Sequence, residues 1–254
     1  MELVTLHRRV VEHWAARVAA VRKDQWGDPT PCTEWSVRQL VNHVVGEELW
    51  TVPLLRGGTI DEVGSQFDGD VLGGEPLGRA RVAADEAAAT VDELVPGGGH
   101  VQLSYGEEDM GEYVRQLCAD HLIHGWDLAA ATGGDTSMDP ELVAEVGTWF
   151  AEREAMYRSG GAIGPRVTGE GDPSSDLLAR FGRDSRWRPN GADDWRRPRV
   201  REALLRQRLA RRAFRAQGAE ASARHQLDGQ QDGNGLHQQQ GHQDHQLDRS
   251  CLKR

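Results

Sequence analysis

The sequence contains no apolar run that approaches the roughly 18–20 residues needed to cross a bilayer as a helix. Residues 1–23 carry charged side chains throughout and lack the apolar segment of a signal peptide. Cysteine is also scarce, and Cys32, Cys118 and Cys251 are too few and too widely spaced to form a disulfide framework. Together these absences predict a cytoplasmic protein with reduced thiols and no membrane partner.

Lysine is almost absent, since only two of the 30 basic residues are lysines, a bias typical of a GC-rich genome. Acidic residues outnumber basic ones by 40 to 30, so the formal net charge is −10. The surplus lies in residues 1–185, whose 15 basic and 32 acidic side chains give a net charge of −17. Binding to nucleic acid depends on clustered Lys and Arg that neutralise phosphates. We therefore expect no nucleic-acid partner.

The sequence divides into a patterned body, residues 1–188, and a tail, residues 189–254. Residues 225–246 of the tail hold eight Gln and four His with hardly any apolar side chain. Such a segment buries too little surface to offset the entropy lost on ordering, which predicts a disordered, low-complexity tail. The four histidines could hold a metal weakly, although a solvated tail explains them better. The abrupt loss of pattern also motivates the hypothesis that the tail is a frameshift or read-through product.

Helical periodicity dominates the body. Apolar side chains recur at spacings of three and four over residues 3–21, 37–56, 78–94 and 111–131, with further helices expected at 140–157 and 174–181. Ser36 and Gln39 form a capping-box pattern at the start of the second helix. Only residues 101–105 alternate as a short strand would. Four long amphipathic helices with modest connections predict an all-α helical bundle, whose core can hold a metal or cofactor.

The densest group of chemically capable residues lies on the fourth predicted helix. Asp120 and His124 are four residues apart, so they share one face of that helix, close to its apolar stripe. A carboxylate that is buried without a partner costs several kcal/mol, and a metal ion supplies the missing compensation. Asp120 and His124 are therefore candidate metal ligands, although the same spacing also fits a simple ion pair on the helix surface.

A third candidate ligand, His43, lies at the margin of the buried face of the second predicted helix. Three N and O donors from two helices leave one coordination position open, as catalytic zinc sites do. Imidazole and carboxylate ligands also suit Fe, Ni and Mn. Other sets stay open at this point, because His121 could chelate together with His124, and Glu47 lies one turn beyond His43. A histidine on an apolar stripe can also be a hydrogen-bonded core residue.

Two stretches of the body carry a family resemblance: residues 30–46, TPCTEWSVRQLVNHVVG, and residues 124–133, HGWDLAAATG. They resemble the N-terminal domain family of mycothiol-dependent maleylpyruvate isomerases, within the DinB/YfiT-like group of metalloenzymes. The resemblance spans roughly residues 3–188. It implies an up-and-down four-helix bundle with an additional helix, and a divalent metal, typically zinc, held by His43, Asp120 and His124. Asp127 lies three residues past His124, where it could orient that ligand.

The resemblance also implies a chemistry. The family's enzymes use the small thiol mycothiol, and a metal-bound thiol loses its proton near neutral pH. The expected partners are thus a small-molecule thiol and an electrophilic substrate, in an isomerisation or an S-transfer. The alternative is a metal-binding or regulatory module without turnover. The assembly state is left open, with a homodimer among the choices.

Overall fold

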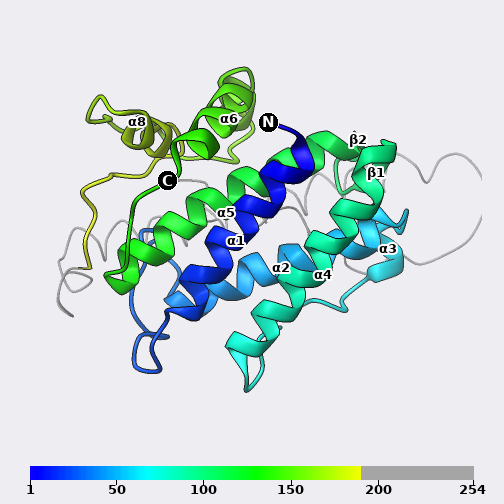
Figure 1. Ribbon diagram of the computed structural model, residues 1–254, viewed down its shortest axis with the longest axis horizontal. Coiled ribbons are helices and arrows are strands. Elements are labelled where there is room, and N and C mark those ends of the chain that lie inside the picture. Colours follow the sequence, from blue (N-terminus) through cyan, green and yellow to red (C-terminus); the bar gives the residue numbers. More distant parts are fainter. Residues whose placement is uncertain (190–254) are drawn as a thin grey trace, which may run out of the picture. The chain divides into compact units, whose positions relative to one another are not determined.

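Four long helices form the core of the structure, a computed structural model that describes residues 1–189 (Figure 1). They are α1 (Leu3–Ala19), α2 (Val37–Leu55), α4 (Pro76–Leu94) and α5 (Met110–Thr132). The shorter elements are α3 (Ile60–Val63), a 3₁₀ turn (Val95–Gly97), β1 (His100–Leu103), β2 (Gly106–Asp109), α6 (Pro140–Ala151), α7 (Glu154–Ser159) and α8 (Pro173–Arg180). The predicted four-helix bundle with additional helical structure is confirmed. The predicted tail, residues 189–254, lies outside the described residues from 190 onward.

In the bundle, α1 packs against α4 and α5, and α2 packs against the same two helices. Helices α1 and α5 run in the same direction, because Leu3 lies next to Gly111 at one end and Arg17 lies next to Gly125 at the other. Helix α2 runs opposite to α5, since Thr51 near its end meets Tyr113 near the start of α5. The middle of α2 therefore faces the middle of α5.

The ends of the helices follow from local chemistry. The Ser36 side chain accepts a hydrogen bond from the Gln39 backbone N–H, and the Gln39 side chain accepts one from the Ser36 backbone N–H, which completes the predicted capping box of α2. Asp109 caps α5. Helix α5 ends at Gly133, whose φ of 68° is a conformation that favours glycine. These caps fix where α2 and α5 begin, and so which of their side chains face each other.

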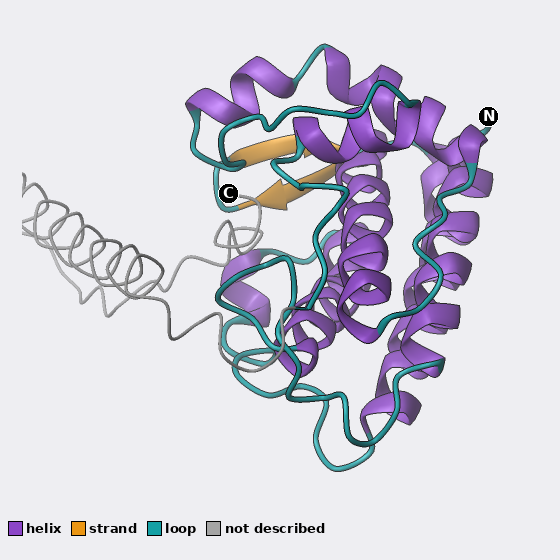
Figure 2. Ribbon diagram, turned by 90° about the vertical axis from the view of Figure 1, so that its left-hand side faces the viewer, coloured by secondary structure: helices purple, strands orange, loops and turns teal. Residues whose placement is uncertain are grey.

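The structure differs from the sequence-based prediction in three short regions. Antiparallel strands β1 and β2 form a hairpin, with His100 opposite Asp109, where one strand was expected (Figure 2). The loop before α4 contains the single turn α3, which has its own capping box. The helix expected over 140–157 is divided into α6 and α7. Arg153 lies at the division, and its guanidinium binds Glu112 of α5, a tertiary contact that sequence periodicity does not register.

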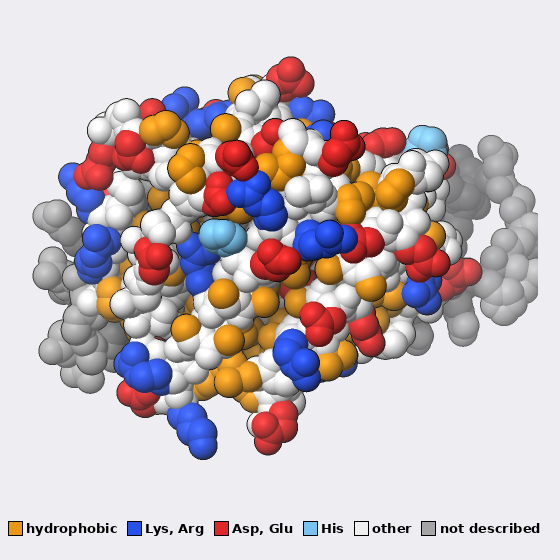
Figure 3. Space-filling model, in the orientation of Figure 1, with side chains coloured by type: hydrophobic (Ala, Val, Ile, Leu, Met, Phe, Trp, Pro, Cys, Tyr) orange, Lys and Arg blue, Asp and Glu red, His pale blue; other side chains and the backbone are white. Residues whose placement is uncertain are grey.

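Apolar side chains fill two adjoining core clusters that are built mainly on α1, α2 and α5. Several polar groups are buried among them, namely His7, Glu48, Asp120, His121, His124 and Asp127. On the face seen in Figure 3, acidic and basic side chains are interspersed. Arg8 pairs with Asp92, and Arg9 pairs with Asp139. Within the described residues, no helix is both long and apolar enough to span a membrane. The unusual feature of the bundle is the group of histidine and carboxylate side chains buried in its interior.

We expect Ser36→Ala to destabilise the protein by about 1 kcal/mol, because the first turn of α2 loses a side-chain cap. Chemical denaturation measures the change in the free energy of unfolding. Ser65→Ala is the matched control, because Ser65 is an exposed turn residue. Equal stability losses in the two variants would show that the capping box does not stabilise α2.

Candidate metal centre

The structure brings together the three side chains that the sequence singled out. Asp120 and His124 project from α5, and His43 reaches them from α2. His43 Nε2 lies 3.3 Å from Asp120 Oδ2, and His124 Nε2 lies 3.2 Å from Asp120 Oδ1. One ligand atom from each residue falls within 4.8 Å of the others. The side chains of Asp120 and His124 are only 3% and 0% exposed, and that of His43 is 8% exposed.

This arrangement could hold a small cation. Among the described residues, both Asp120 oxygens and His124 Nε2 are buried without a hydrogen-bond partner, despite their short separations. Donor atoms bound to one tetrahedral zinc at 2.0–2.1 Å lie about 3.3 Å apart, and two bound imidazoles have ring centres about 5 Å apart. The His43 and His124 ring centres are 5.2 Å apart, with the rings nearly perpendicular. The separations within the cluster are thus compatible with ligands of one zinc ion.

The charges of the cluster reinforce one another. Burial by itself raises the pKa of Asp120, but the neighbouring His124 and His43 outweigh burial and hold that pKa well below its ordinary value. Burial lowers the pKa of His124, but Asp120 and Asp127 outweigh it and raise that pKa to about 9. Asp120 is therefore an ionised buried carboxylate, and His124 holds a proton that a metal ion would displace.

The other ring nitrogen of His124, Nδ1, is hydrogen-bonded to Asp127. Its Nδ1 lies 2.9 Å from Asp127 Oδ2, and Asp127 is fully buried. The carboxylate accepts the Nδ1–H, so the Nε2 atom is the one left to face Asp120 and His43. The predicted position of Asp127 behind His124 matches the geometry. Arg183, which sequence reasoning did not single out as a functional residue, donates to the same carboxylate from the chain beyond α8.

A second group of potential ligands lies on this side of His124. Cys32 Sγ is 3.8 Å from His124 Nδ1 and 3.2 Å from Asp127 Oδ2. The Arg183 guanidinium already provides a positive charge here, with Nη2 2.9 Å from Asp127 Oδ2 and 3.2 Å from the sulfur. The charge of Asp127 is thus compensated without a metal. Both groups could hold a metal ion, and they differ in that Arg183 already faces the Cys32 and Asp127 side.

The two alternative ligands are not part of this centre among the described residues. His121 Nδ1 lies 2.8 Å from the Leu117 carbonyl, and His121 Nε2 lies 3.2 Å from Glu48 Oε1. Neither His121 nor Glu47 belongs to a group of close ligand atoms in the described part of the chain. The sequence reasoning considered Glu47 and missed Glu48. The signal was present, because Glu48 lies four residues after Val44 and therefore on the buried face of α2.

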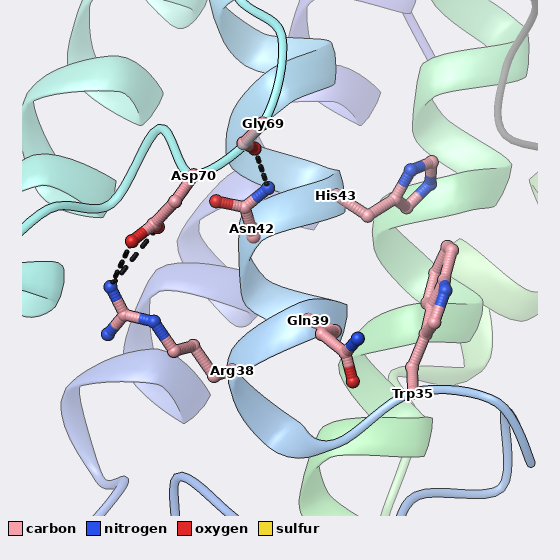
Figure 4. A pocket seen from close by; sticks show the side chains of 7 residues that line it. All are labelled: Trp35, Arg38, Gln39, Asn42, His43, Gly69 and Asp70. Carbon is pink, nitrogen blue, oxygen red and sulfur yellow. Dashed lines mark hydrogen bonds and ion pairs between the residues drawn. The ribbon is translucent and has the colours of Figure 1, made fainter.

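A pocket of about 430 Å³ lies beside α2 and has His43 in its lining (Figure 4). His43 and Trp35 stand side by side on one wall, with ring centres 4.7 Å apart. On the opposite wall, Arg38 pairs with Asp70, and Asn42 donates to the Gly69 carbonyl, so the loop before α4 is tied to α2. The complete lining is Trp35, Arg38, Gln39, Asn42, His43, Gly69 and Asp70. A small molecule in this pocket would therefore lie against the His43 ring.

Comparisons with known proteins identify the family of the chain. Residues 7–129 match the model of the mycothiol maleylpyruvate isomerase N-terminal domain. Two Mycobacterium tuberculosis proteins, both described as uncharacterized, are 36% identical over 183 residues: MT0763 of strain CDC 1551 / Oshkosh and Rv0738 of strain H37Rv. Each alignment covers 69% of this chain and 87% of the relative. The chain belongs to the mycothiol maleylpyruvate isomerase N-terminal domain family.

The fold has a counterpart among solved structures. The crystal structure of the mycothiol-dependent maleylpyruvate isomerase aligns with a TM-score of 0.57 and 16% identity. The alignment covers 73% of this chain and 90% of that chain. At this level of identity the likeness establishes the shared helical fold, and activity has to be argued from the site itself.

We expect His124 in the metal-free protein to titrate with a pKa of about 9, because Asp120 and Asp127 stabilise its charged form. The raised pKa stabilises the fold fully below about pH 6.5, and this contribution is lost as the pH rises through 9. NMR of the imidazole signals between pH 6 and pH 10 measures it.

Asp127→Asn should lower the His124 pKa by removing one of the two charges. His7 is the internal control, because burial and His121 lower its pKa to about 3, so its signal should stay constant over this range. A His124 signal that titrates below its ordinary value of 6.5 in the wild type would contradict the charge arrangement described here.

Proposed function

We propose that this protein binds one divalent cation through His43, Asp120 and His124 and uses it to activate a small thiol. The observation that carries the proposal is the buried Asp120 carboxylate, whose two oxygens have no hydrogen-bond partner among the described residues and face one imidazole each. An ionised carboxylate in such a position is stable only with a compensating positive charge. A metal ion held by the three side chains would supply that charge in place of the proton that His124 holds in the metal-free protein.

Zinc is the cation that this donor set fits best. Two imidazoles and one carboxylate match the ligands of catalytic zinc sites, in which a fourth position stays open for water or substrate. Iron, nickel and manganese accept the same ligand types, so metal analysis has to identify the ion. Asp127 supports this assignment, because a carboxylate behind a ligating imidazole is a common feature of zinc sites.

The pocket beside His43 supports a small-molecule ligand. Its volume of about 430 Å³ lies within the range of small-molecule sites, roughly 300–1,000 Å³. The aromatic face of Trp35 and the polar side chains of Arg38 and Gln39 offer both stacking and hydrogen-bond contacts. A hydrophilic thiol suits such a lining, and the domain family carries the name of one, mycothiol.

The proposed chemistry begins with the thiol. A zinc ion held by His43, Asp120 and His124 would lower the pKa of a thiol bound to it, so that thiolate would form near neutral pH. The thiolate sulfur attacks an electrophilic carbon and forms a C–S bond. With an activated cis double bond, the electron pair moves to the activating carbonyl, the former double bond rotates, and loss of the thiolate leaves the trans isomer. With a leaving group, the displaced group departs with the electron pair, and the outcome is S-transfer.

The chain's own residues have defined tasks in this scheme. His43, Asp120 and His124 hold the cation, and Asp127 keeps the His124 ring oriented through Nδ1. The Trp35 ring lies over the His43 ring and limits the access of water to that side. A metal-binding or regulatory module without turnover would use the same ligands. The two functions differ only in whether a bound thiol reacts.

We expect purified wild-type protein to contain one zinc ion per chain when it is produced with ample zinc. His43→Ala and His124→Ala should each weaken zinc binding by more than the roughly 10–100-fold that loss of an outer-shell partner costs. Elemental analysis and competition with a chromophoric chelator measure stoichiometry and affinity, with circular dichroism as the check on folding. His100→Ala is the matched control, because that histidine is exposed on β1. Stoichiometry near zero in the wild type would overturn the proposal.

We expect the zinc-loaded protein to accelerate the reaction of mycothiol with an electrophile, and His124→Ala to abolish the acceleration. A panel of activated cis alkenes, maleylpyruvate among them, and alkyl halides separates isomerisation from S-transfer. Product analysis distinguishes the two, because isomerisation regenerates the thiol and S-transfer consumes it. Tight binding of mycothiol without any product from the panel would favour the module without turnover.

A further inference from the structure

The feature that goes beyond the metal ligands is a buried arginine from the end of the described chain. Arg183 is only 3% exposed, although it follows α8 and lies 56 residues from Asp127 in sequence. Its guanidinium donates to Asp127 through Nε at 3.0 Å from Oδ1 and through Nη2 at 2.9 Å from Oδ2. Its Nη1 donates to the Phe181 carbonyl at 3.1 Å. The guanidinium is thus held by Asp127 through Nε and Nη2 and by the Phe181 carbonyl through Nη1.

The two-point contact orients the Asp127 carboxylate. Paired hydrogen bonds from a planar guanidinium fix the plane of a carboxylate as well as its charge. Asp127 Oδ2 also accepts from His124 Nδ1 at 2.9 Å. The plane of Asp127 therefore sets the direction of the Nδ1 hydrogen bond and, through the rigid ring, the direction in which Nε2 points. That direction is toward Asp120 Oδ1.

The fold explains why Arg183 reaches this position. Helix α8 packs its Leu177 and Leu178 into the core, and Phe181 stacks on Phe150 of α6 with ring centres 3.9 Å apart. Gly182 then turns the chain with a φ of 78°, and the Arg183 backbone N–H bonds the Leu178 carbonyl. The docking of α8 therefore delivers the guanidinium to Asp127.

From these contacts we propose that Arg183 is a positioning residue of the metal centre, which acts through Asp127 to hold His124 in the orientation that binds the cation. The inference rests on the proposed metal binding. It adds that metal affinity is coupled to the packing of α8. Because Arg183 arrives only when α8 is docked, metal affinity depends on the packing of the C-terminal part of the body. By linkage, metal binding stabilises that packing in return.

The test compares zinc affinity in Arg183→Met, Arg183→Lys and Asp127→Asn with the wild type, by competition with a chromophoric chelator. We expect Arg183→Met and Asp127→Asn each to weaken zinc binding about 10- to 100-fold, as loss of an outer-shell partner does. The double variant should lose little more than either single variant, because both changes break one chain of contacts. Arg183→Lys should recover part of the affinity, since it restores the charge but not the two-point contact.

Arg180→Met is the matched control. Arg180 lies at the end of α8 and makes comparable contacts, donating to Glu154 and to the Gly147 carbonyl, but it does not touch Asp127. We expect its removal to lower stability while zinc affinity stays within about threefold of the wild type. The visible spectrum of bound Co²⁺ gives a second readout, which should change in Arg183→Met and remain that of the wild type in Arg180→Met.

Each outcome has a defined meaning. Wild-type zinc affinity in Arg183→Met, or an equal loss in Arg180→Met, would overturn the positioning role while leaving the metal site intact. A wild type that binds no zinc would overturn the proposed function instead. If Arg183→Met does not fold, the zinc affinity of Arg183→Lys decides the matter. A weaker affinity than that of the wild type supports the role, because the lysine lacks the two-point contact, and wild-type affinity refutes it.

Discussion

The burial of the Asp120 carboxylate is the constraint around which the interior of this bundle is organised. A charged group at 4% exposure needs a compensating charge close by, and among the described residues the Asp120 oxygens have no hydrogen-bond partner. His43 and His124 stand on either side of it at 3.2–3.3 Å. The three side chains are therefore a candidate donor set for a cation, built from two helices whose relative register is fixed by their caps and by apolar packing.

Three other buried polar groups are compensated in different ways elsewhere in the bundle. Asp127 is neutralised by Arg183, which keeps the pKa of this buried carboxyl low although burial alone would raise it. Glu48 faces His121 at 3.2 Å, and burial raises the pKa of the Glu48 carboxyl. His7 has no hydrogen-bond partner among the described residues, and burial keeps it neutral. Against these cases, only the Asp120 cluster combines ionised charge, convergent donors and an adjacent pocket.

The segment that matches the family model contains the candidate metal ligands but not Arg183. Residues 7–129 include His43, Asp120, His124 and Asp127, whereas Arg183 lies beyond them. The outer part of the site is thus assembled from a region in which α8 has to pack before it can contribute. Sites of this kind join metal affinity to the integrity of the whole body, because orientation of one ligand depends on distant packing.

The sequence by itself determined the four long helices, the capping box of α2 and the position of Asp120 and His124 on one face of α5, because helical period and cap chemistry are local properties. It also placed His43 at the edge of a buried face. Only the tertiary structure decided that His43 rather than Glu47 meets that pair and that His121 turns to Glu48. It alone showed that Arg183 binds Asp127, which in turn binds His124. Spacing along a helix fixes the angle at which a side chain leaves its axis, whereas the partner that it meets depends on how neighbouring helices are ordered and aligned.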